Sequence, residues 1–102
     1  MIDFGSGPQL GQIARIINGR DSGQYAIIVR LENGPYIYLA DGEKRKFDHP
    51  KKKNVQHIQL MHHISPEVQS SIKETGRVTN GKLRFALAKF RNESISEWKK
   101  GD

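Results

Sequence analysis

Positive charge is concentrated in one short segment of the sequence, residues 44–53. Six cationic side chains fall within these ten positions: Lys44, Arg45, Lys46, Lys51, Lys52 and Lys53. The acidic residues close to them are Glu43, beside the segment, and Asp48, inside it. Ammonium and guanidinium groups at this density bind phosphate groups, and counterion release makes such binding strongly salt-dependent. The alternative is an ordinary solvated loop, because runs of charge commonly are no more than that.

A second candidate site is the glycine-bounded turn Asn18-Gly19-Arg20-Asp21-Ser22-Gly23. Its glycines would leave backbone amides open to a ligand, and Arg20 would project beside them. Equally, Gly19 and Gly23 could serve the turn alone through their backbone freedom. We leave both interpretations of the glycines open and favour a nucleic-acid contact for Arg20.

Other residue types that could do chemistry form no catalytic or metal-binding pattern. Among the histidines, His62 and His63 are adjacent and point apart in regular structure, with no acidic neighbour to complete a metal site. We find no nucleophile–base arrangement, no carboxylate pair and no phosphate-cradling loop of the nucleotide-hydrolase type. We therefore expect no enzyme activity, no metal, no cofactor and no small-molecule substrate.

The tyrosines could stack on unpaired bases or pack in a core. For Tyr25 we predict the core, while both possibilities stay open for Tyr36 and Tyr38.

Whole-chain composition points in the same direction as the basic segment. Seventeen Lys and Arg against eleven Asp and Glu give a formal net charge of +6 and a pI near 9.8. Such a balance favours polyanionic partners. The absence of cysteine excludes disulfides and thiolate metal sites. With no secretory signal and no apolar run long enough for a membrane span, we expect a cytoplasmic protein without a membrane partner.

Short strands and tight turns should position these residues. Apolar and β-branched runs predict strands in the stretch 11–31, which contains a hairpin around the 18–23 turn, and at 36–40, 43–47 and 55–60. Between the last two lies an expected loop, 48–54, which contains Lys51, Lys52 and Lys53. In the second strand, Tyr25, Ile27, Val29 and Leu31 share one face, which we expect to be the core side.

Helical signals follow the strands. Ser65 can cap a helix that Gly76 ends, and Thr79 or Asn80 can cap a second. The second carries Leu83, Ala86, Leu87 and Phe90 at helical spacing. The tail, 94–102, either extends this helix or is disordered. The expected organisation is a flexible lead-in at 1–10, a small barrel at 11–62 and a helical appendage at 63–102.

The hairpin stretch also resembles the KOW motif of ribosomal proteins and transcription-elongation factors, and this motif covers about a fifth of the chain. The matching positions are Gly11, Ile13, Gly19, Asp21, Gly23, Ile27 and Val29. Ala40-Asp41-Gly42 and the basic residues after it are similar to small bacterial KOW-domain RNA-binding proteins, which in turn resemble large-subunit ribosomal proteins.

The resemblance implies a mainly β fold, α+β overall, with a five-stranded SH3-like barrel, and a turn that contacts RNA in related proteins. Together with the charge, it favours non-catalytic binding of RNA, specifically ribosomal RNA, by a ribosomal or ribosome-associated protein. The expected contacts are Arg20, Lys44, Arg45, Lys46, Lys51, Lys52 and Lys53. Two alternatives remain: an elongation-type module that contacts polymerase, a ribosomal protein or nucleic acid, and a protein-interaction module that docks through the barrel or the 83–90 helix face.

Overall fold

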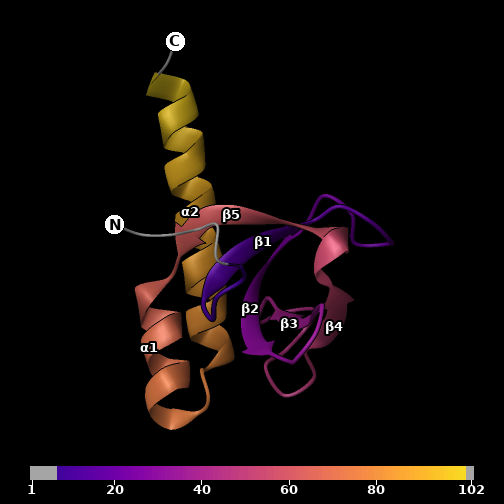
Figure 1. Ribbon diagram of the computed structural model, residues 1–102. Coiled ribbons are helices and arrows are strands. Elements are labelled where there is room, and N and C mark those ends of the chain that lie inside the picture. The colour runs from indigo at the N-terminus through magenta and orange to yellow at the C-terminus, as the bar shows by residue number, and fades with distance from the viewer. Residues whose placement is uncertain (1–6, 101–102) are drawn as a thin grey trace.

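A computed structural model describes residues 7–100, and residues 94–100 through their backbone alone. Within that range five strands precede two helices (Figure 1). The strands are β1 (Gln12–Ile16), β2 (Tyr25–Leu31), β3 (Tyr36–Ala40), β4 (Lys51–Asn54) and β5 (Ile58–Ile64). The helices are α1 (Pro66–Thr75) and α2 (Asn80–Lys100), and a single 3-10 turn, η2 (Val55–His57), joins β4 to β5.

The strands form one antiparallel sheet in the order β4-β3-β2-β1-β5. The predicted fold class, mainly β and α+β overall with five strands and two following helices, is confirmed. The sheet curves strongly, so that β4 and β5 are brought round toward each other through η2 (Figure 1). In the described residues β4 and β5 stand at the two ends of the hydrogen-bonded order, and the ladder is not closed between them.

Apolar side chains are buried on both faces of the curved sheet. The outer face packs against the helices and includes Ile27 and Val29. The inner face encloses a second cluster, to which Ala26 and Ile28 belong. The predicted core face of β2 is buried at Ile27 and Val29, with Tyr25 packed against them, but the structure adds two features to this prediction. A sheet that curls on itself buries its concave face as well, and Leu31 remains 44% exposed at the end of β2.

The fourth strand lies later in the chain than predicted. Residues 43–47 form turns, because the Asp41 carboxylate oxygen Oδ1 accepts hydrogen bonds from the amides of Glu43 (2.8 Å) and Arg45 (2.9 Å). The strand is instead Lys51–Asn54, within the segment 48–54 that was expected to be a loop, and it pairs with β3. The fifth strand begins at Ile58 rather than at position 55, because η2 occupies the three residues before it.

The helix boundaries follow the predicted signals. The Ser65 hydroxyl accepts from the Val68 amide at 3.3 Å, and Gly76 ends α1 with a left-handed φ of 79°. Of the two candidate caps for α2, Thr79 accepts from the Lys82 amide at 3.1 Å. The tail belongs to α2 through Lys100, while residues 101–102 and positions 1–6 of the expected lead-in lie outside the described residues. In the part described, neither helix has the length and apolar character needed to cross a membrane.

Candidate nucleic-acid interface

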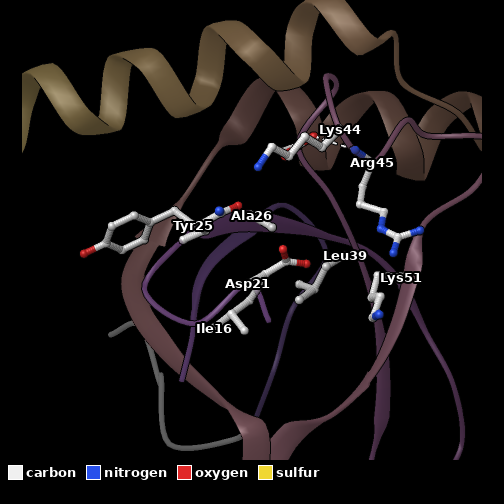
Figure 2. A pocket seen from close by; sticks show the side chains of 10 residues that line it. Ile16, Asp21, Tyr25, Ala26, Leu39, Lys44, Arg45 and Lys51 are labelled. Carbon is white, nitrogen blue, oxygen red and sulfur yellow. Dashed lines mark hydrogen bonds between the residues drawn. The ribbon is translucent and has the colours of Figure 1, made fainter. Parts of the chain in front are cut away.

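Charged side chains from two segments that are distant in the sequence meet at one end of the curved sheet. Lys44, Arg45 and Lys51 line a cavity of about 190 Å³ together with Asp21 from the hairpin tip (Figure 2). The cavity opens over apolar residues of the inner cluster, Ile16, Ala26 and Leu39 among them. We call this opening the mouth. The curvature of the sheet therefore brings the two sequence-predicted candidate sites, the turn and the basic segment, together.

The alternation of side chains along β4 separates its three lysines. Lys51 and Lys53 lie opposite Leu39 and Ile37, whose side chains face the inner cluster. Because cross-strand partners share a face, these two half-buried lysines also lie on the inner side. A Cβ atom placed on Gly19 would lie 3.0 Å from the Lys53 Nζ. The tip of the hairpin therefore lies close to this ammonium group.

Lys52 points to the outer side, where its ammonium group forms an ion pair and a cation–π contact. Its Nζ lies 3.3 Å from Glu32 Oε1 and 4.6 Å from the centroid of the Tyr36 ring. Glu32 also accepts a 2.8 Å hydrogen bond from the Tyr38 hydroxyl. The hydrogen bond from Tyr38, followed by that from Lys52, lowers the pKa of Glu32, and the hydrogen bond and charge of Glu32 raise the pKa of Lys52.

The three tyrosines have different surroundings. Tyr25 is half-buried against Phe90 with a centroid separation of 5.2 Å, so its predicted core position is confirmed. Tyr36 is 39% exposed. Tyr38 lies under the Arg30 guanidinium, 5.1 Å from its ring centroid. A base that stacked on Tyr36 would have to share the ring with Lys52 or displace it, and a base on Tyr38 would meet Arg30 in the same way.

The remaining predicted site residues are dispersed. Arg20 is exposed at the hairpin tip and Lys46 is exposed in the turn after β3, and neither lines the mouth. Gly23 lines a neighbouring cleft of about 520 Å³ with Lys44. Gly11 lies at the start of β1 with φ +84°, where a Cβ would come within 3.0 Å of Gln69 and Ser65. Its position serves the packing of β1 on α1.

Two arginines of α2 lie near the basic segment but were not predicted from the sequence to be site residues. Arg91 lines the cleft beside Lys44, and the Arg84 Nη1 donates a 2.7 Å hydrogen bond to the Gly42 carbonyl. Their seven-residue spacing places them on one side of the helix. This spacing is the sequence feature that could have indicated a shared basic surface. The partner surface could not be inferred, because the segment they approach is some forty residues earlier in the chain.

The mouth suits contact with a charged polymer along its rim better than enclosure of a small anion. The Asp21 carboxylate points toward the middle of the mouth, with the three cationic side chains around it (Figure 2). A phosphate placed at the centre would be repelled by this carboxylate, whereas phosphates on the rim would meet the ammonium and guanidinium groups. Within the described residues no group of three or more His, Cys, Asp or Glu side chains is placed to hold a metal ion.

Comparison with known proteins identifies a relative. No family model matches the sequence. The chain is 46% identical over 71 residues to a protein of Bacillus subtilis (strain 168) named "Putative ribosome-binding protein YbzG". The chain belongs to the YbzG family. The alignment covers 96% of YbzG and 70% of this chain, so 30% of this chain has no counterpart in that alignment.

Proposed function

We propose that this protein associates with the ribosome by binding ribosomal RNA, without catalysis. The observation that carries the proposal is the convergence of the hairpin tip with the basic segment around the mouth. The name of YbzG and the resemblance of the hairpin to the KOW motif support the ribosome as the partner. Such a role would place the protein in the cytoplasm.

The proposed contacts are to the phosphate backbone. Lys44, Arg45 and Lys51 would neutralise phosphates at the mouth. Lys53, beside Gly19 of the hairpin tip, would contribute next to it, and Arg20 and Lys46 at the periphery. Phosphate contacts position a protein on nucleic acid but do not read its sequence. Folded RNA, which is recognised largely by shape and backbone, fits this inventory of side chains better than a specific base sequence does. Lys52 contributes less, because Glu32 already neutralises much of its charge.

Cosedimentation with purified ribosomes across a salt series tests the proposal. We compare the wild type with Lys51→Gln/Lys53→Gln, which removes two charges from the inner side of β4. The control, Lys52→Gln/Lys89→Gln, also removes two charges, but from the outer side of β4 and from α2. Each lost phosphate contact should reduce the slope of log affinity against log salt by roughly 0.7–0.9.

We expect the wild type to migrate with one ribosomal subunit, and less so as salt rises. The inner-side variant should bind more weakly and with a shallower salt slope than the control variant. If the wild type stays at the top of the gradient even at low salt, ribosome binding is wrong. Equal losses in the two double variants would show that the inner side of β4 has no special part in binding.

A further inference from the structure

The segment that carries Lys44 and Arg45 is fastened to α2 at both of its ends. This segment, residues 41–47, contains no strand or helix, and we call it the basic loop. At its start, the Arg84 Nη1 donates to the Gly42 carbonyl at 2.7 Å. At its end, the Phe47 amide donates to the Asn80 Oδ1 at 2.8 Å. Two polar side chains one turn apart on α2 thus hold both ends of the loop.

Hydrogen bonds within the basic loop fix the backbone between these two anchors. The Asp41 carboxylate accepts from two loop amides, as described above. In addition, the amides of Asp41 and Gly42 donate to the Arg45 carbonyl at 2.9 and 3.0 Å. Gly42 has a φ of +82° and lies so close to the Asn80 carbonyl that no Cβ fits there. The loop is therefore one fixed unit seated on the first turns of α2.

We propose that Asn80 and Arg84 are positioning residues for RNA binding, which they support by holding the basic loop at the mouth. The proposal rests on the function proposed above. A loop that is already ordered loses little conformational entropy when it binds, whereas a mobile loop must be ordered at the expense of affinity. Helix α2 thereby has a part in binding. Asn80 has no charge that could attract a phosphate, so its contribution would come through the loop alone.

The sharpest variant is Asn80→Ala, because it removes the acceptor for Phe47 and leaves every cation in place. Ser71→Ala is the matched control, since it removes one side-chain hydrogen bond to backbone, from Ser71 to the Arg77 carbonyl, far along the chain from the basic loop. Both variants are measured for binding to purified ribosomal RNA and for hydrogen exchange at the amides of residues 43–47.

We expect Asn80→Ala to speed exchange at Phe47 and to weaken RNA binding by about threefold to tenfold, the loss that one hydrogen bond typically brings. Ser71→Ala should leave both quantities unchanged. Asn80→Asp, which keeps an acceptor, should restore slow exchange at Phe47.

Arginine variants separate positioning from direct charge contact. Arg84→Met and Arg91→Met remove the same charge from the same side of α2, but Arg84 alone of these two bonds to the loop. If Arg84 positions the loop, Arg84→Met should lose more RNA affinity than Arg91→Met. Arg84→Lys, which keeps a donor and the charge, should recover RNA affinity.

Equal losses for the two methionine variants, or wild-type affinity for Asn80→Ala, would overturn the inference while the proposed function stood. Failure of the wild type to bind the RNA would overturn both.

Discussion

Neighbouring lysines in β4 have different surroundings, and this difference arises from the pleat of a strand. Lys51 and Lys53 are half-buried on the inner side, so their aliphatic stems can cover apolar surface. Lys51 lines the mouth, and the ammonium group of Lys53 lies near Gly19 of the hairpin tip. Lys52 is paired with Glu32 on the other side. The sequence predicted a concentration of phosphate-binding charge here. It did not predict that the three lysines point to different sides, because the segment was expected to be a loop, in which side chains do not alternate between two faces.

The Glu32–Lys52 pair gives a prediction about pH. The pKa of Glu32 is lowered in the folded protein, so its contribution to stability is present above its unfolded-state pKa, which is near 4.5, and is lost as the pH falls through the folded-state value. The pKa of Lys52 is raised in the folded protein. The stability that Lys52 contributes is therefore fully present below its unfolded-state pKa, near 10.5, and is lost as the pH rises through the folded-state value. We therefore expect Glu32→Gln to unfold at a lower temperature than the wild type at neutral pH.

The difference between the two melting temperatures should shrink toward zero as the pH is lowered from 7 to 3, because protonated glutamate resembles glutamine. Thermal unfolding followed by circular dichroism at several pH values measures it. A difference that stays constant over this range would show that the carboxylate charge is not what stabilises the fold.

Secondary-structure elements were predictable where local signals decide them. The β1–β2 hairpin, β3, and the capped ends of α1 all follow from turn residues, β-branched runs and capping side chains. β4 was misplaced because lysine and asparagine are poor strand formers, and what makes Lys51–Asn54 a strand is its pairing with β3. A strand at the end of a sheet tolerates such residues, but its partner is not visible in local sequence.

The contact between the basic loop and α2 predicts unequal costs for two glycine substitutions. Gly42 and Gly34 both have left-handed backbone, with φ of +82° and +91°. Gly34 has open space where a Cβ would lie, so Gly34→Ala should cost about 1–2 kcal/mol from backbone strain alone. Gly42→Ala must also push against the Asn80 carbonyl and Leu83, and should cost roughly 3 kcal/mol or more.

Urea unfolding of the two glycine variants gives the comparison directly. Similar losses for Gly34→Ala and Gly42→Ala would mean that the loop can move away from α2 at little cost, contrary to the geometry described here.

At the scale of the whole molecule, the sheet lies between two apolar clusters. Leu83, Leu87 and Phe90 of α2 share the outer cluster with Ile27 and Val29 of the sheet. The signal for two-sided burial was present in the run Tyr25-Ala26-Ile27-Ile28-Val29, which is apolar without alternation. How the helices would cover the outer face could not be predicted, since that depends on contacts between residues far apart in sequence.

The shared outer cluster predicts that the strands and helices unfold together. Leu87 is almost fully buried in it, so Leu87→Ala should lower the free energy of unfolding by about 2–5 kcal/mol. Helix loss measured at 222 nm and the near-ultraviolet signal of the tyrosines should then change at the same denaturant concentration. Two separated transitions, with the helices lost first, would indicate that 63–102 is an independent appendage.

The lysines of β4 have a consequence for self-association. β4 stands at one end of the hydrogen-bonded order in the described residues, and a strand in that place can pair with the strand of another molecule. Charged side chains, lysine above all, oppose such pairing through mutual repulsion. The side chains proposed to hold RNA would therefore also keep free copies of the protein apart. Their neutralisation by mutation should lower solubility as well as affinity, so a reduced yield of such variants would reflect this second role of the same charges.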